Sequence, residues 1–195
     1  MKKLKISEIK DWLKKYNIHN YIINNDLTVS VKNNVDLRKA KLKHIPVKFK
    51  HVDGYFTCAD NFLLNLDFCP EVVTSFLDVS SNRLTNLKGV SKLIGTNFIC
   101  HDNLITTLNY APQEVGKSML CNFNLIDSLH NLLTKFNNSF NTCHRNKFHR
   151  IQGLDNFYKF NDRLIITHED VKKYQLSLQL ESRLCFKPAN ELMKI

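Results

Sequence analysis

The chain is poor in the residues and segments that mark several protein classes. It has 195 residues but only 5 Gly and 4 Pro, which argues against a loop-dominated or fibrous chain. No apolar run approaches the roughly 20 residues of a membrane span. Charged residues interrupt the basic start MKKLKISEIKDWLKKYNI at helical spacing, so it lacks the apolar core of a signal peptide. These absences predict a protein that works in a cytoplasm.

Motifs of common catalytic sites are also missing. The sequence has no Gly-rich phosphate loop, no G-x-S-x-G and no H-E-x-x-H. None of its 6 Cys forms a C-x-x-C pair, and in a chain without a secretory signal they are expected to be thiols rather than disulfides. We predict that the chain is not an enzyme and has no cofactor or metal site.

Apolar residues and positive charge are the features that the sequence does have. Apolar residues make up 43% of the chain and include 13 Phe, which is enough for one domain with a sizeable core. Residues 1–50 hold 13 Lys and Arg against 4 Asp and Glu, whereas residues 51–150 hold 8 of each kind. The basic character therefore belongs to the N-terminal quarter, which bears on any interaction with nucleic acid.

A pattern with a period of 21 residues runs through the middle of the chain. We call its reference residue the anchor; it recurs at Leu37, Cys58, Val79, Cys100 and Cys121, and after 22 residues at Cys143. Most anchors are followed three residues later by Asn, at Asn61, Asn82, Asn103, Asn124 and Asn146, with Ala40 at the first position. Apolar residues hold the positions five and eight after the anchor, and two and six before it. Chance does not maintain so many columns over more than 100 residues.

With its skeleton V-x-x-x-[FLM]-x-[CV]-x-x-N-x-[LI]-x-x-L, the chain resembles the leucine-rich repeat family. The short period, with Pro70 and Pro112 in the return segments, is similar to the bacterial subclass, which includes pathogen effectors and small proteins of bacterial viruses. The N-terminal block from IKDWLKKYNI to VDGYFTC is most similar to the viral group. The resemblance covers about residues 16–155 and implies an α/β solenoid, a horseshoe with about six repeats and a parallel sheet on its concave face.

The expected organisation is a single domain in three parts. Residues 1–30 are a helical N-terminal cap, residues 31–160 hold the repeats, and residues 161–195 are a C-terminal cap with a strand at 163–167 and a helix from about 168. In the N-terminal cap, Ile6, Ile9, Leu13 and Tyr16 recur at helical spacing, with Ser7 as the predicted N-cap. Such caps cover core that would otherwise meet water.

The Cys and Asn columns are interpreted as structural. Val79 and Leu37 replace Cys at equivalent anchors, so the position is a packing site in which free Cys acts as a small hydrophobe. Met119 belongs to the core by the same pattern. The Asn column is predicted to form a buried ladder, in which each side-chain amide bonds backbone groups of its own and the neighbouring turn.

The solvent-facing positions of the concave sheet are the predicted binding site. They lie one and three residues before the anchor and one and two after it, and include the early Thr57 and Asp60. A patch of apolar side chains on an exposed sheet indicates a protein partner. The predicted partner-binding residues are Tyr55, Phe76, Asp78, Ile99, His101, Asp102, Leu120, Asn122, Phe123, Phe140, His144 and Arg145. On the convex side, Phe62, Leu104 and Leu125 are expected to be partly buried and receive no role.

Two functions remain open from the sequence. The resemblance implies a non-catalytic module that binds a protein, as a viral protein would when it blocks or sequesters a host defence or regulatory factor in the host cytoplasm. The alternative is nucleic-acid binding by the basic N-terminus, with Tyr55 and Phe76 stacking on bases. The predicted basic patch consists of Lys10, Lys14, Lys15, Arg38, Lys39, Lys41 and Lys43.

Overall fold

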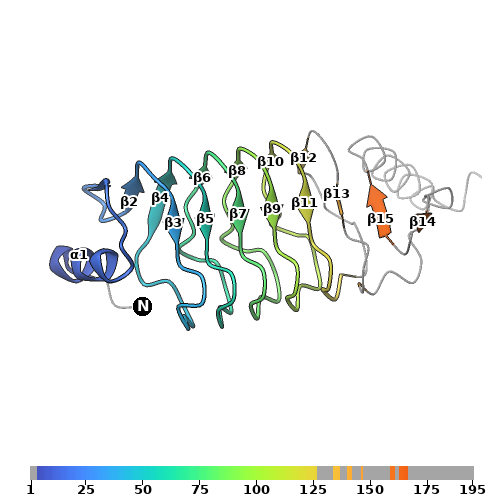
Figure 1. Ribbon diagram of the computed structural model, residues 1–195, viewed down its shortest axis with the longest axis horizontal. Coiled ribbons are helices and arrows are strands. Elements are labelled where there is room, and N and C mark those ends of the chain that lie inside the picture. Colours follow the sequence, from blue (N-terminus) through green and yellow to red (C-terminus); the bar gives the residue numbers. More distant parts are fainter. Residues whose placement is uncertain are drawn as a thin grey trace, which may run out of the picture.

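The chain forms a parallel β-solenoid. The computed structural model describes residues 4–126, 134–136, 140–141, 146, 159–160 and 163–166. The chain winds in coils of 21 residues, and corresponding strands of successive coils pair in parallel, as in Phe56 with Leu77 and Leu77 with Phe98. Figure 1 shows the coils stacked along the long axis of the molecule. The described anchors from Leu37 to Cys121 span four such steps.

Each coil contributes one short strand to each of two sheets. The first sheet has the order β1 (Tyr21–Ile23), β2 (Val29–Val31), β4 (Phe49–Val52), β6 (Val72–Val73), β8 (Leu93–Ile94), β10 (Glu114–Val115) and β12 (Lys135–Phe136). All pairs in it are parallel except β1 with β2, which are antiparallel. The antiparallel strand β1 therefore covers the N-terminal edge of the first sheet.

The second sheet contains the strands before each anchor. Its order is β14 (Lys159–Phe160), β15 (Arg163–Ile166), β13 (Phe140–Asn141), β11 (Met119–Leu120), β9 (Phe98–Ile99), β7 (Leu77–Asp78), β5 (Phe56–Thr57) and β3 (Val35–Asp36). Strands β3 to β13 are parallel, whereas β15 is antiparallel to both β13 and β14. The strand predicted at 163–167 is confirmed by β15; the helix predicted after it lies outside the described residues.

The sequence pattern predicts one sheet, and the structure has two. The strands of the first sheet lie in the segment in which the sequence pattern predicts no strand. It holds the apolar column six residues before the anchor, from Val31 through Val52, Val73 and Ile94 to Val115. These side chains are buried and face the buried side of the second sheet. The interior of each coil is thus enclosed by two sheets rather than by one sheet and a strandless return.

The helix expected at the N-terminus is confirmed as α1 (Ile6–Lys15), and it lies at the N-terminal end of the solenoid (Figure 1). Ile9 and Leu13 are buried in the core, as the helical spacing predicts. Two details were wrong: the N-cap is Lys5 rather than Ser7, and Ile6 is 50% exposed. No helix in the described part of the chain is long and apolar enough to cross a membrane.

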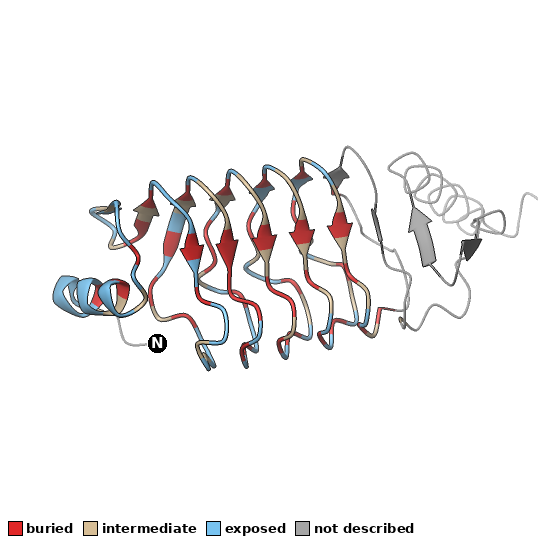
Figure 2. Cartoon of the chain, in the orientation of Figure 1, coloured by how far each residue is buried: buried red, intermediate tan, exposed pale blue. Residues whose placement is uncertain are grey.

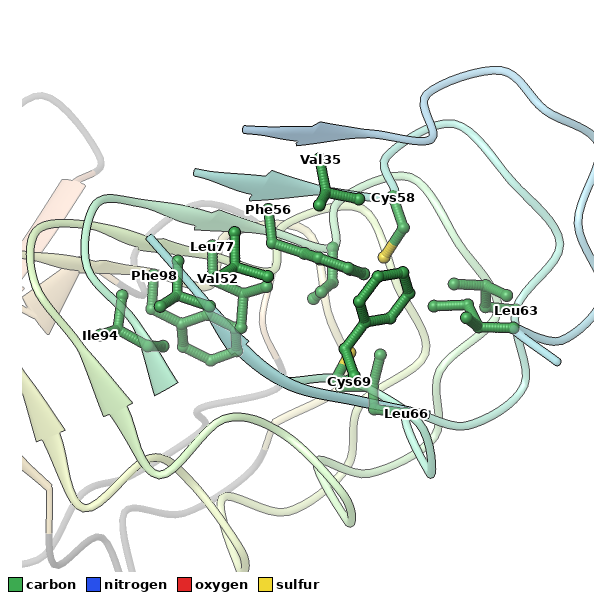
Figure 3. Packing of buried hydrophobic residues seen from close by; sticks show 14 of the residues in the cluster. Val35, Val52, Phe56, Cys58, Leu63, Leu66, Cys69, Leu77, Ile94 and Phe98 are labelled. Atoms are coloured by element: carbon green, nitrogen blue, oxygen red, sulfur yellow. The ribbon is translucent and has the colours of Figure 1, made fainter. Parts of the chain in front are cut away.

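The core is a column of side chains between the two sheets. The described anchors Leu37, Cys58, Val79, Cys100 and Cys121 are all at most 1% exposed, so the packing interpretation is confirmed for them. Met119 is also buried, as predicted. Figure 2 shows buried residues recurring at equivalent places in successive coils, and Figure 3 shows Val35, Phe56, Leu77 and Phe98 together with Cys58 and Cys69 in one interior.

The asparagine ladder is confirmed in atomic detail. The Asn103 side-chain oxygen accepts a hydrogen bond of 3.0 Å from the Leu84 backbone N–H of the preceding coil. Its amide nitrogen donates to the carbonyl oxygens of Val79, Cys100 and His101 at 3.1, 3.2 and 3.1 Å. Asn82 and Asn124, one coil earlier and one coil later, make the same set of bonds, and so does Asn61 two coils earlier. Each asparagine therefore joins two coils and satisfies backbone groups that the bend leaves unpaired.

Candidate functional site

The outer face of the second sheet carries the side chains that the sequence predicts as a binding surface. Residues one before the anchor point away from the core because strand side chains alternate between faces. From the N-terminal coil onward they are Asp36, Thr57, Asp78, Ile99 and Leu120. The row changes from charged to apolar along the solenoid, and Ile99 and Leu120 are half-buried rather than covered.

An aromatic pair extends this apolar surface towards the N-terminus. Tyr55 and Phe76 occupy the position three before the anchor in neighbouring coils, and their rings stack with centroids 4.8 Å apart and planes 12° from parallel. The spacing of paired strands, about 4.8 Å, dictates the ring separation. Both side chains are half-buried. The pair therefore presents a preformed flat aromatic edge to a partner.

The N-terminal end of the face is polar and contains a bidentate ion pair. Arg38 donates to both carboxylate oxygens of Asp36, with Nη2–Oδ2 at 2.6 Å and Nε–Oδ1 at 3.0 Å. The hydrogen bonds from Arg38 hold the pKa of the Asp36 carboxyl below its ordinary value. The carboxylate of Asp36, the last residue of β3, thus offsets the positive charge of Arg38.

His101 and Asp102 lie side by side in the turn after β9. His101 Nδ1 is 3.4 Å from Asp102 Oδ2, and both side chains are accessible. Asp102 has a left-handed backbone, with φ of 53°, as do the residues two after every other described anchor. The backbone of this turn positions the two side chains. The neighbouring, buried Asn103 stabilises the turn by donating hydrogen bonds to the carbonyl oxygens of Cys100 and His101.

Phe123 ends the described part of the predicted surface. It occupies the same left-handed position as Asp102, one coil later, and is 38% exposed, while Asn122 beside it is half-buried. Of the remaining predicted residues, only the backbone of Phe140 is described, as part of β13. His144 and Arg145 lie outside the described residues.

Not every predicted position is open to solvent. Thr57, expected on the exposed face, is only 2% exposed, so that expectation was wrong. Its short side chain lies in the row between Asp36 and Asp78, and its hydroxyl is 3.4 Å from the Ala59 backbone N–H. Asp78 is half-buried, and its carboxylate accepts hydrogen bonds from the backbone and hydroxyl of Ser80. Asp36 likewise accepts a hydrogen bond of 3.1 Å from the Arg38 backbone N–H, so three of the five residues in this row bond to their own turns.

The residues of the predicted basic patch are exposed. They are Lys10, Lys14 and Lys15 on α1, and Arg38, Lys39, Lys41 and Lys43 after β3. The end of α1 meets the turn after β3 at a hollow of about 600 Å³, which is lined by Tyr16 and Asn17 on one side and by Arg38 and Lys39 on the other. Of the patch, Arg38 and Lys39 line this hollow and the lysines of α1 do not, and Arg38 is already paired with Asp36.

A second apolar surface was missed by the sequence reading. Phe62 and Leu104, expected to be partly buried at the turn, are 42% and 47% exposed, and only Leu125 of that column is half-buried. Leu64, two residues after Phe62, is 61% exposed. The period identifies this column of apolar residues but does not indicate whether their side chains are exposed. Apolar residues at tight turns are expected to pack inward, so the exposure of Phe62 and Leu104 was not predicted.

The cysteines that the structure describes belong to the core. Cys58, Cys69, Cys100 and Cys121 are buried thiols. The pKa of the Cys58 thiol is raised well above its ordinary value. The larger cause is a hydrogen bond with Cys69, and the second is burial. No group of three or more His, Cys, Asp or Glu side chains suited to a metal ion occurs in the part of the chain that the structure describes. Cys69, without an interpretation from sequence, is a core residue; Cys185 lies outside the described residues.

Comparison with other proteins gives no assignment. No protein-family model matches the chain, and no curated protein or solved structure matches it at a significant level.

Proposed function

We propose that the protein is a non-catalytic module that binds a partner protein through the outer face of the second sheet. The observation that supports this most directly is the set of accessible apolar side chains on that face, formed by Tyr55, Phe76, Ile99, Leu120 and Phe123. The solenoid buries its own core between the two sheets, so folding does not require apolar side chains on this face. Aromatic anchors in a preformed surface are typical of protein interfaces.

The finer class is part of the same proposal. The repeat period, the asparagine ladder and the helix at the N-terminal end support assignment to the short bacterial-type leucine-rich repeats, with a concave second sheet and a strand–helix cap in residues 161–195. On this assignment the protein comes from a bacterial virus. It acts in the host cytoplasm by blocking or sequestering a host defence or regulatory protein.

Affinity capture from a bacterial lysate tests the proposed surface. The full chain is the bait, beside variants Phe76→Ser and Phe123→Ser on the proposed face. The control is Ile22→Ser, which removes an apolar side chain that is 53% exposed on the first sheet. The expected result is one stoichiometric protein that is retained by the wild type and the control but lost from both face variants. Retention by both variants, at unchanged unfolding midpoints, would show that another surface binds.

Nucleic-acid binding is the second candidate, favoured by the exposure of Lys10, Lys14 and Lys15 on one helix beside the hollow that Lys39 lines. The cations of such a patch would release the counterions condensed on a phosphate backbone, so binding would weaken steeply with salt. Pairing of Arg38 with Asp36 weakens this candidate, because it removes one cation from the patch.

Salt-dependent binding distinguishes the two candidates. If nucleic acid is the partner, the chain will shift single-stranded RNA or DNA, and the triple variant Lys10→Gln, Lys14→Gln, Lys15→Gln will abolish the shift while Phe123→Ser preserves it. If the partner is a protein, the captured protein will be retained by that triple variant. The protein-binding proposal fails if the captured material is nucleic acid alone.

A further inference from the structure

The turns that follow the second sheet present a strip of side chains separate from the proposed binding face. The turn strip consists of Lys41, Lys43, Phe62, Leu64, Arg83 and Leu104, which stand four or six residues after the anchors of four successive coils. Phe62, Leu64 and Leu104 are 42%, 61% and 47% exposed. They account for three of the eight large apolar side chains that are most exposed in the described chain, and they lie within three coils. This clustering distinguishes the strip from isolated surface leucines.

Several backbone N–H groups under the strip are already engaged. The N–H groups of Phe62, Arg83 and Leu104 donate to carbonyl oxygens of the preceding coils at 2.8, 3.0 and 2.9 Å. The next N–H groups along the chain, those of Leu63 and Leu84, donate to the asparagine ladder. These N–H groups are not available to a partner strand, which favours recognition through side chains. A helix laid in a groove is recognised through the side chains of one face.

A shallow hollow in the strip is formed in the structure. It measures about 470 Å³ and is lined by Lys43, Phe62, Leu64 and Arg83. The Arg83 guanidinium lies over the Phe62 ring, 5.0 Å from its centroid, which holds both side chains in place. The hollow thus combines two apolar side chains with two cationic ones.

The charge of the strip is of one sign. From residue 41 to residue 106, the positions four and six after the anchors hold Lys41, Lys43 and Arg83 but no Asp or Glu. Cations beside apolar side chains complement a partner that places carboxylates beside apolar anchors. We propose that the turn strip docks an acidic amphipathic helix of a partner protein, with its apolar residues over Phe62, Leu64 and Leu104 and its carboxylates facing Lys41, Lys43 and Arg83.

The dimensions agree with this occupant. Lys41 and Leu104 stand three coil steps apart, or about 14 Å at the spacing of paired strands. A helix covers that length in about ten residues, and residues spaced by three or four positions lie on one face of it. A nucleic acid would use the cations but would gain little from Leu64 and Leu104, whose aliphatic side chains cannot stack on bases.

The test is a selection from a displayed library of helical peptides, with the full chain as target. The peptides are about 18 residues long, with Glu or Lys in equal supply at the polar positions and Leu, Phe, Ala or Ser at the apolar positions. Selection on the wild-type chain should enrich Glu over Lys and Leu or Phe over Ser. The best peptide, labelled and measured by fluorescence anisotropy, should lose about tenfold in affinity for each of Leu64→Ser, Leu104→Ser and Arg83→Glu.

Matched controls make each outcome decisive. Ile22→Ser and Phe123→Ser remove exposed apolar residues elsewhere and should leave peptide affinity unchanged, and unfolding midpoints verify that every variant is folded. The proposal would be overturned if the selection enriched Lys or enriched nothing. It would also be overturned if the peptide lost affinity on Phe123→Ser but not on Leu64→Ser. Single-stranded RNA that binds the wild type and loses binding on Leu64→Ser would overturn it too, as would a dimer in solution that dissociates on the same change.

Discussion

At the scale of single residues, the asparagine three after each anchor performs a task that no apolar residue can. Its oxygen accepts from a backbone N–H of one coil while its nitrogen donates to carbonyl oxygens of two coils, as Asn103 does with Leu84, Val79 and Cys100. Asn103 is buried, so water does not replace these bonds if they are lost. The residue type is dictated because only an amide offers both a donor and an acceptor in that space.

Removal of one rung should destabilise the protein markedly. We expect Asn103→Ala to lower the free energy of unfolding by about 2–4 kcal/mol, because buried backbone groups lose their partners. Urea denaturation followed by circular dichroism measures the change. The exposed Asn65, which accepts only a 3.4 Å bond from its own turn, supplies the control Asn65→Ala, expected to change little. Equal losses for the two variants would contradict the role of the ladder.

The ion pair on the second sheet predicts a pH dependence. Arg38 lowers the folded-state pKa of Asp36 below its ordinary value of 3.8, so the pair stabilises the fold above about that pH. This stabilisation is lost as pH falls through the lower, folded-state pKa, because the unfolded chain then binds the proton first. In an NMR titration of the carboxyl carbons, Asp36 should titrate below 3.8, and Arg38→Gln should move its midpoint back upward. An unchanged midpoint in the variant would show that Arg38 is not the cause.

At the scale of strands and turns, the columns with one residue type were predictable and the mixed ones were not. The anchors and the Asn rungs repeat a chemical property, so their burial follows from the period alone. The outward row of the first sheet mixes polar and apolar residues, namely Ser30, His51, Val72, Leu93 and Glu114, so these strands were missed although their inward column is apolar throughout. The exposure of Phe62 and Leu104 was missed for another reason, since it depends on the shape of the turn rather than on sequence spacing.

Gly95 and Gly116 lie where the backbones of successive coils approach closely. A Cβ added to Gly95 would collide with the carbonyl oxygen of Thr74 in the preceding coil, and one added to Gly116 would collide with that of Gly95. We expect Gly95→Ala to cost about 1–3 kcal/mol, because backbone must shift to admit the methyl group. Thr74 occupies the same position one coil earlier and is exposed, so Thr74→Ala should have little effect. Thermal unfolding of both variants provides the measurement, and a neutral Gly95→Ala would show that the coils are less tightly stacked.

At the scale of the whole molecule, the solenoid gives each coil contacts mainly with its neighbours. Strand pairing follows this rule, because each described parallel strand from β4 to β11 pairs with the strands one coil before and after it. Stability in such a molecule is close to a sum of terms for coils and for the interfaces between adjacent coils. The two proposed surfaces then depend on different features of the same coils: the strand rows form one, and the turns form the other.

Pairs of rung substitutions should reveal this nearest-neighbour rule. Asn82 and Asn103 both donate to the carbonyl oxygen of Val79, at 3.2 and 3.1 Å, so either residue alone keeps that oxygen bonded. The double variant Asn82→Ala, Asn103→Ala should therefore lose more stability than the sum of its single variants, by about 0.5–3 kcal/mol. Asn61 and Asn124 share no acceptor and stand three coils apart, so their double variant should be additive within about 0.5 kcal/mol. Urea denaturation of all six variants in one stabilising osmolyte yields both coupling energies. A coupling energy for Asn61 with Asn124 as large as the expected one for Asn82 with Asn103 would contradict the nearest-neighbour rule, and no coupling in either pair would contradict the shared role of the Val79 oxygen.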